Sequence, residues 1–216
     1  LFFMIKKINL GVLISGSGNT LQNFIDHIEK GKLHATIQIV ISSKPNVVGL
    51  DRARKHNIPT AVIPYSNYNN DIDTFSRAIT AKLDTYPIDL VTLAGFVHFY
   101  KIPENYKGKV MNIHPGLIPA FCGHHYYGKK VHEAAINYGV KVSGCTVHFA
   151  DNVYDNGPII IQRAVPVLED DTPDTLAERV FKEECEAYPE AIRLFAEGRL
   201  KIEGRKVKIL QPLNNT

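Results

Sequence analysis

INLGVLISGSGNTLQNFIDHIEK (8–30) is the most informative stretch of this chain for its architecture. It starts with an apolar, β-branched run, Ile8 to Ile14, which predicts a buried strand. A glycine-rich turn at 15–19 follows, and then a segment of helical period from Thr20 to Lys30. The apolar positions of that segment lie at i, i+3, i+4 and i+7 and predict an amphipathic helix: Leu21, Phe24, Ile25 and Ile28. A strand, a turn and a helix in this order are typical of an α/β protein.

The same alternation of apolar runs and helical periods continues along the chain. It predicts a single α/β domain, 1–216, with a mostly parallel twisted sheet and helices on both faces. Residues 1–4 are expected to be an N-terminal extension and 211–216 a tail. Pro189 is expected to kink or interrupt the last helix. Further strands are expected at Ala35–Ile41, Thr60–Ile63, Leu90–Ala94, Lys109–His114, Val142–Phe149 and Ile159–Val167, a hairpin within Leu200–Leu210, and further helices at Val48–Lys55, Ile72–Leu83, Val131–Tyr138 and after the N-cap Thr172.

The composition of the chain argues against several classes of protein. The chain has 216 residues, 44% of them hydrophobic, which is enough for one buried core. Lys and Arg number 25 against 22 Asp and Glu, a net charge of +3, and they are dispersed, which argues against a nucleic-acid partner. Three irregularly spaced cysteines argue against a disulfide framework, and no apolar run approaches the ~18 residues of a membrane span. We expect a cytoplasmic protein without a membrane partner, with Met4 as its natural start.

The glycine-rich turn SGSGNTL (15–21) predicts an anion site. A strand, a turn and a helix N-terminus present unpaired backbone N–H groups and the positive end of a helix dipole, which suits a phosphate. The dinucleotide fingerprint would need a third glycine where Leu21 stands and an acid where Ser42 and Ser43 stand, and no GK[ST] follows. The alternative is a tight turn in which the glycines serve only backbone shape.

The tetrapeptide Asn112-Ile113-His114-Pro115 predicts a second site. Residues two apart in a strand share a face, so Asn112 and His114 are expected to point together. Pro115 ends the strand, which places an amide and an imidazole at the carboxyl edge of the sheet, where open α/β sheets build their sites. The alternative is a hydrogen-bonded core Asn and a His that merely ends a strand.

A polar loop in VHFADNVYDNGPIII (147–161) carries Asp151 and Asp155. A carboxylate near His114 would raise the pKa of the imidazole and make it a competent acid. The alternative for each aspartate is a solvated turn residue. A metal site is disfavoured because the spacing of the potential ligands matches no common zinc pattern and because Cys145 and His148 lie on opposite faces of a regular strand: Cys122, His124, His125, His132, Cys145 and His148.

Several segments in the same order resemble the phosphoribosylglycinamide formyltransferase family of folate-dependent enzymes. They cover nearly the whole chain: LISGSGNTLQ, VISSKPNVVGLDRA, DLVTLAGF, MNIHPGLIPAF, KVSGCTVHFADNVYDNGPIIIQ, AYPEAI and FAEGRLKIEGRKV. The resemblance implies a Rossmann-like formyltransferase fold and transfer of the formyl group of 10-formyltetrahydrofolate to the amine of glycinamide ribonucleotide in purine biosynthesis. It implies no bound cofactor and no metal, with 10-formyltetrahydrofolate as the cosubstrate.

The resemblance also implies roles for residues. The Asn-x-His-Pro motif and a later Asp match the catalytic residues Asn112, His114 and Asp155. The ribonucleotide phosphate and ribose would be held by Gly18, Asn19, Thr20, Leu21 and Glu184. The folate would contact Gly95, Val97, His98, Phe99, Tyr100, Asn112, Asp151, Asn152, Val153, Tyr154 and Asp155. The partners it implies are small-molecule substrates, and a homodimer is compatible with it.

The sequence departs from the family pattern at the folate segment. The family commonly reads Met-Arg-Ile-Leu where this chain has Val97 to Tyr100. Asp71 stands where a basic residue is often found, and Gly116 replaces a common Ser. The alternatives are a 10-formyltetrahydrofolate hydrolase, a formyltransferase for another amine, and a binding module without catalysis. The hydrolases and tRNA formyltransferases usually carry an extra domain, and retention of all three catalytic residues argues against the binding module.

Overall fold

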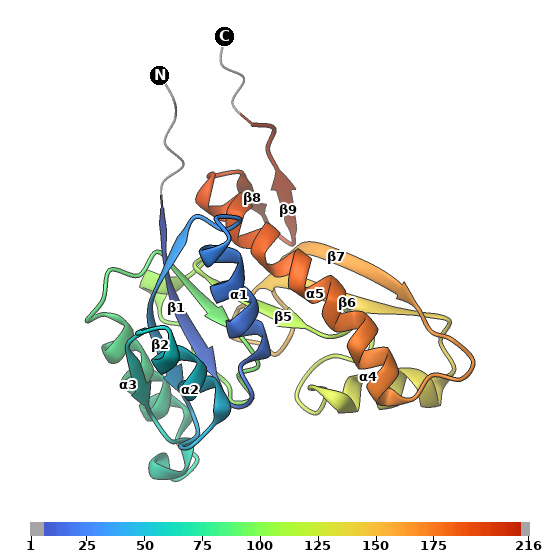
Figure 1. Ribbon diagram of the computed structural model, residues 1–216, viewed down its shortest axis with the longest axis horizontal. Coiled ribbons are helices and arrows are strands. Elements are labelled where there is room, and N and C mark those ends of the chain that lie inside the picture. The colour runs from blue at the N-terminus through green and yellow to red at the C-terminus, as the bar shows by residue number, and fades with distance from the viewer. Residues whose placement is uncertain (1–6, 213–216) are drawn as a thin grey trace. The chain divides into compact units, whose positions relative to one another are not determined.

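The computed structural model describes residues 7–212 and has an α/β fold with a mostly parallel sheet (Figure 1). The predicted fold class is therefore confirmed, whereas the expected extension at 1–4 and the end of the tail, 213–216, lie outside the described residues. The elements are β1 (Ile8–Ile14), α1 (Asn19–Glu29), β2 (Ala35–Ser42), α2 (Val48–Lys55), β3 (Thr60–Val62), η1 (Tyr65–Tyr68), α3 (Ile72–Leu83), β4 (Leu90–Leu93), η2 (Glu104–Tyr106), β5 (Val110–His114), α4 (Lys129–Tyr138), β6 (Val142–Phe149), β7 (Ile159–Pro166), α5 (Pro173–Ala196), β8 (Leu200–Glu203) and β9 (Lys206–Ile209).

These elements form two compact units that meet within β5. The unit 7–112 holds five parallel strands in the order β3-β2-β1-β4-β5. Right-handed crossovers place α1 and α2 on one face of this sheet and α3 on the other. The register pairs Ile14 at the end of β1 with Ser42 at the end of β2, so the loops after both strands start side by side.

The unit 113–212 has a different sheet pattern. Its long strands β6 and β7 are antiparallel, and the hairpin of β8 and β9 adds to β7 through a short parallel pairing. Helix α5 packs on β6 and β7 and also contacts α4. Since β6 and β7 follow each other through a short loop rather than a crossover helix, the antiparallel arrangement is the expected one.

Helix α5 continues for 24 residues through Pro189, so the expected interruption at this proline is wrong. A proline inside a helix removes one backbone hydrogen bond, but burial of its neighbours can compensate for that loss. Here Tyr188, Ala191 and Ile192 around the proline are all fully buried, and their packing keeps the chain helical.

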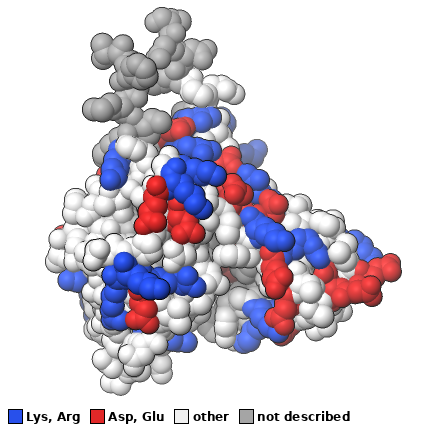
Figure 2. All heavy atoms as spheres, in the orientation of Figure 1, with Lys and Arg blue, Asp and Glu red and all other residues white. Residues whose placement is uncertain are grey.

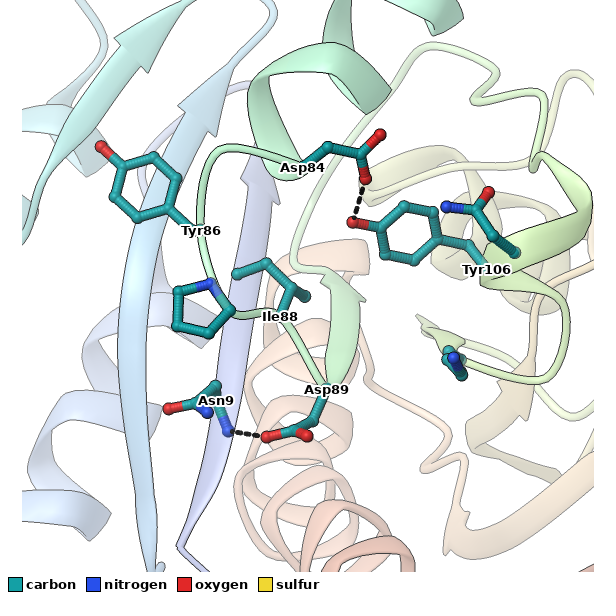
Figure 3. A pocket seen from close by; sticks show the side chains of 9 residues that line it. Asn9, Asp84, Tyr86, Ile88, Asp89 and Tyr106 are labelled. Atoms are coloured by element: carbon teal, nitrogen blue, oxygen red, sulfur yellow. Dashed lines mark hydrogen bonds between the residues drawn. The ribbon is translucent and has the colours of Figure 1, made fainter.

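The surface shown in Figure 2 has Lys and Arg interspersed with Asp and Glu. No helix within 7–212 combines the length and the apolar character that crossing a membrane requires. A hollow of about 390 Å³ lies at the amino ends of β1, β4 and β5 in the unit 7–112, lined by Asn9, Asp84, Tyr86, Asp89 and Tyr106 among others (Figure 3). Its carboxylates already accept hydrogen bonds, Asp84 from the Tyr106 hydroxyl and Asp89 from the Asn9 N–H.

The first testable prediction concerns the N-terminal cap of α5. Thr172 caps the helix by accepting from the Thr175 N–H at 3.2 Å, and the Thr175 hydroxyl in turn accepts from the Thr172 N–H at 3.0 Å. Thr172→Ala is expected to lower the free energy of unfolding by about 1 kcal/mol, because a backbone donor loses its partner. Urea denaturation checks this, with Ser66→Ala at an exposed position of η1 as the control. A loss in the control equal to that in Thr172→Ala would contradict the capping role.

Candidate active site

A cluster of polar side chains in the unit 113–212 is centred on Asp155. This residue follows β6 and has a φ of +48°, a left-handed backbone that aspartate tolerates better than most residues. Its Oδ2 accepts a hydrogen bond from the Gly123 N–H at 2.9 Å and lies 3.5 Å from His114 Nδ1. Its Oδ1 lies 3.8 Å from Nε2 of His148, which is almost fully buried in β6. The structure thus brings the predicted pair His114 and Asp155 together.

His114 ends β5 and is 3% exposed. Its Nε2 lies 2.9 Å from the Phe121 carbonyl oxygen, and because a carbonyl only accepts, Nε2 carries a proton. The second ring nitrogen, Nδ1, faces Asp155, so a further proton on His114 would be placed against a carboxylate. In His114, Nε2 is therefore the hydrogen-bond donor, and Nδ1 is the atom that gains or loses a proton.

The pKa of His114 lies below its ordinary value, because burial disfavours the charged ring more than Asp155 and the Phe121 carbonyl favour it. The expected effect of Asp155, which is to raise the pKa of His114, is present, but burial outweighs it. Burial also opposes ionisation of Asp155, yet its interactions with His148, His114 and Gly123 hold the pKa of that carboxyl below its usual range. The resting pair is an ionised carboxylate beside a neutral imidazole.

His148 and His132 are the residues of this cluster to which the sequence assigned no role. The Nδ1 of His148 donates to the Phe149 carbonyl at 2.9 Å, which leaves Nε2 to face Asp155. His132 is 3% exposed on α4, and within the described part of the chain its Nδ1 has no hydrogen-bond partner. Burial, with a smaller contribution from His114, lowers the pKa of His132 to about 4. The available signal was the apolar neighbours in the sequence: Val147 and Phe149 flank His148, and Val131 precedes His132.

Asn112 stands two residues before His114 in β5 and projects from the same side of that strand. It is half-buried, and its strand pairs with β4 through Leu93. The predicted sharing of a face by Asn112 and His114 therefore follows from the observed strand.

The glycine-rich turn lies in the unit 7–112 and delivers the N-terminus of α1. Gly18 has a φ of +70°, and a Cβ there would lie 2.6 Å from the Gly49 Cα of α2, so only glycine fits. The Gly49 N–H donates to the Gly16 carbonyl at 3.1 Å and fixes the turn. Helix α1 begins at Asn19, so the N–H groups of its first turn, which includes Thr20 and Leu21, are available to an anion. The Leu21 side chain is fully buried and can contribute only its backbone.

Arg52 on α2 holds this turn and was not singled out from the sequence. Its guanidinium donates to the Ser17 carbonyl at 2.9 Å, to Asn19 Oδ1 at 3.1 Å and to Gln22 Oε1 at 3.3 Å. A cation therefore lies beside the exposed N-terminus of α1. The signal in the sequence was the basic run at the end of α2, which by spacing alone reads as a solvated helix face.

The segment predicted to contact folate, 95–100, starts with Gly95 at a φ of +74° just after β4. Val97 is 42% exposed, whereas Tyr100 is 3% exposed and its hydroxyl is 2.9 Å from that of Thr80 on α3. The side chain of Tyr100 thus belongs to the core, and the pKa of its phenol rises to about 12 because of that burial. His98 and Phe99 are partly buried.

The remaining predicted folate residues, 151–154, form the turn that leads to Asp155. Asp151 organises it, since Oδ1 accepts from the Val153 N–H and Oδ2 from the Asn156 side chain, both at 2.9 Å. Asn152, Val153 and Tyr154 are exposed.

Glu184 lies on α5, and burial raises the pKa of its carboxyl to about 7. Its charge also acts on the buried thiol of Cys145 in β6. Among residues 7–212 no group of three or more His, Cys, Asp or Glu side chains is arranged to hold a metal ion.

Comparisons with known proteins assign this geometry to a family. Residues 8–192 match the formyl transferase family. The chain is 37% identical to phosphoribosylglycinamide formyltransferase of Escherichia coli, over 90% of each protein. A crystal structure of glycinamide ribonucleotide transformylase 1 from Symbiobacterium toebii superposes with a TM-score of 0.89 at 44% identity, covering 98% of both chains. The trifunctional purine biosynthetic protein adenosine-3 of Homo sapiens is 44% identical over 91% of this chain, which spans only 19% of that protein's length.

The buried His132 generates a prediction about acid stability. Its pKa is about 4 in the folded chain against an ordinary 6.5, so the unfolded chain takes up the proton first as the pH falls. The free energy of unfolding should therefore fall between pH 7 and pH 4, by about 3 kcal/mol from this residue alone. His132→Asn is expected to remove most of that loss in urea denaturation at a series of pH values. The exposed His34→Asn is the control and should keep it, and an equal pH dependence in both variants would contradict the assignment.

Proposed function

The chain belongs to the formyl transferase family, in its phosphoribosylglycinamide formyltransferase branch, and we propose that it transfers the formyl group of 10-formyltetrahydrofolate to the amine of glycinamide ribonucleotide in purine biosynthesis. The observation that carries the proposal is the buried pair of Asp155 and His114, with Nδ1 of the imidazole 3.5 Å from the carboxylate and a proton held on Nε2. His114 belongs to the Asn-x-His-Pro motif, and Asp155 is the later aspartate, to which the family resemblance assigns catalysis.

The reaction needs a hydrogen-bond donor that stabilises negative charge on the formyl oxygen, and it needs a path for one proton. The substrate amine attacks the formyl carbon, and the carbonyl electron pair moves onto the oxygen, which becomes an oxyanion. The Nε2–H of His114 is the donor that would stabilise it, once the Phe121 carbonyl gives up its hydrogen bond. The amide of Asn112 on the same side of β5 is a second donor.

Collapse of the tetrahedral intermediate breaks the bond from the formyl carbon to the folate nitrogen. The attacking amine loses one proton and the leaving nitrogen gains one, so the two exchanges balance. His114 is suited to relay that proton, because Asp155 stabilises the imidazolium that forms while burial keeps the resting ring neutral. No covalent bond to the protein is required.

We propose that the turn at the start of α1 binds the ribonucleotide. Backbone N–H groups of Asn19, Thr20 and Leu21 would bind the phosphate, Gly18 permits the close approach, and the guanidinium of Arg52 fixes the turn and adds positive charge. Glu184, whose pKa of about 7 makes it an acceptor or a donor near neutral pH, would contact the ribose.

The folate is proposed to contact the backbone of Gly95 to Tyr100, the Val97 side chain, Asn112, and the turn from Asp151 to Asp155. The buried Tyr100 side chain is left out of this set. We further propose a cytoplasmic protein that acts on small molecules and needs neither a nucleic acid nor a membrane. A homodimer stays a prediction.

The experiment for this function measures tetrahydrofolate formed from 10-formyltetrahydrofolate by the purified protein, with and without glycinamide ribonucleotide. Formation that requires the ribonucleotide is the expected result. Equal formation in its absence would instead indicate the hydrolase, and none in either sample would leave another amine acceptor or a binding module as the function.

The proton relay generates a kinetic prediction. His114→Ala is expected to lower kcat by at least about 100-fold, the usual effect of losing a positioned acid or base, with KM values changed far less. His125→Ala, at an exposed position of the loop after β5, is the control. Steady-state kinetics at pH 7.5 decide it, and a kcat for His114→Ala within threefold of the control would contradict the assignment.

The phosphate turn generates a prediction about binding. Arg52→Met is expected to raise KM for the ribonucleotide by about tenfold, because the turn loses three charge-assisted hydrogen bonds to one guanidinium. Arg54→Met is a matched control on the same helix, since the Arg54 guanidinium forms an ion pair with the exposed Asp51. Equal KM values for the two variants would show that Arg52 does not support the site.

A further inference from the structure

Three polar side chains after three neighbouring strands form a hydrogen-bonded chain that the reaction described above does not use. Ser15 follows β1, Ser43 follows β2, and His98 lies in the segment after β4. The two hydroxyl oxygens are 2.6 Å apart, and Ser43 Oγ is 2.9 Å from His98 Nδ1. Ser15 and Ser43 are 5% and 3% exposed, so water does not compete for these bonds.

One set of directions gives every proton of these hydrogen bonds an acceptor. The Ser15 oxygen accepts from the Val97 N–H at 3.0 Å, and the Ser15 hydroxyl can donate its own proton to Ser43. The Ser43 hydroxyl proton then goes to His98 Nδ1, which accepts it only when that nitrogen is unprotonated. A proton on His98 Nδ1 would reverse the direction of both hydrogen bonds. Ser43 would then donate to Ser15, and the Ser15 hydroxyl would lose Ser43 as its acceptor.

The surroundings of His98 keep the ring neutral. Three aromatic side chains enclose it, Tyr65 with ring centroids 4.5 Å apart, Phe75 at 5.8 Å and Phe96 at 6.1 Å. Burial, and then the charge of Lys44, lower the pKa of His98. Within residues 7–212, this cation and the Tyr65 phenol are titratable groups that face the ring.

The chain of hydrogen bonds joins the two loops that meet the substrates. Ser15 opens the glycine-rich turn, and its backbone N–H donates to the Gly95 carbonyl at 3.1 Å. Its side chain holds the Val97 N–H, so both ends of the 95–97 segment are tied to the first residue of the phosphate turn. A shift of this tie would displace the backbone that faces the folate.

We propose that Ser15, Ser43 and His98 act as a positioning relay, in which neutral His98 accepts from Ser43 and thereby fixes the 95–97 backbone for folate binding. The inference rests on the proposed function and adds a specificity-determining residue at the position where the family commonly has arginine. It follows that folate affinity decreases as the pH falls through the pKa of His98, below 6.5, because protonation reverses the relay.

Two variants of His98 separate the relay from simple packing. His98→Phe keeps an aromatic ring among Tyr65, Phe75 and Phe96 but gives Ser43 no acceptor. His98→Asn removes the ring but places an amide oxygen where Nδ1 accepts, and it does not titrate. Ser43→Ala breaks the relay in its middle, and His34→Asn, at an exposed position of the same unit, is the control. All are titrated calorimetrically from pH 5 to pH 8 with 10-formylfolic acid, which lacks the reduced ring nitrogen and stays intact in acid.

The relay predicts about 5- to 10-fold weaker binding at pH 7.5 for His98→Phe and Ser43→Ala, the usual net effect of one buried hydrogen bond. His98→Asn should restore the affinity that His98→Phe loses and should bind with less pH dependence than the wild-type protein, whereas His34→Asn keeps the wild-type profile. Tight binding by His98→Phe together with weak binding by His98→Asn would overturn the relay in favour of ring packing. So would a pH profile of His98→Asn that matches the wild-type profile.

The same titrations distinguish this proposal from the proposed function. A wild-type protein with no affinity for 10-formylfolic acid and no formyl transfer would contradict both. A wild-type protein that binds and transfers, with unchanged affinity in Ser43→Ala and His98→Phe, would overturn the relay alone.

Discussion

The unit 113–212 depends on the placement of one carboxylate. Asp155 accepts a hydrogen bond from the loop after β5 through Gly123, faces His114 at the end of β5, and faces His148 in β6. A buried carboxylate is costly unless its oxygens are satisfied, so these partners must come together before the site can form. The left-handed backbone at Asp155 is the local strain that aims the carboxylate inward. The proposed catalysis and the arrangement of the surrounding loops therefore depend on the same carboxylate.

In the unit 7–112, backbone geometry rather than a buried charge fixes the turn before α1. Gly18 and Gly49 allow the turn before α1 to lie against α2, and Arg52 satisfies a carbonyl and two side chains of that turn. Helix α1 then starts at Asn19, and the N–H groups of its first turn have no carbonyl partner within the helix, which suits the anion site that we propose there.

The sequence predicts the regular elements closely, because their signals are local. The spans of β1 and α2 agree with the expected ranges, and α1 is shifted by one residue at each end. Pro189 shows where local reasoning fails, since the packing of Tyr188 and Ile192 outweighs the loss of one hydrogen bond. The same holds for the site: features set by local spacing are predicted from the sequence, and features set by burial are not. Spacing in one strand predicts that Asn112 and His114 share a face, but it carries no information on burial, and burial sets the direction of the His114 pKa and brings in His148 and His132.

Asp155 lies where it stabilises a proton on His114 against the effect of burial. ¹⁵N-labelled histidine spectra recorded from pH 4 to pH 9, on the wild-type protein and on Asp155→Asn, test it directly. We predict that His114 carries its proton on Nε2 at high pH and that the pKa of its ring falls further in Asp155→Asn, because the opposing burial then acts without the carboxylate. A His114 pKa that stays the same or rises in Asp155→Asn would show that Asp155 does not stabilise the proton on His114.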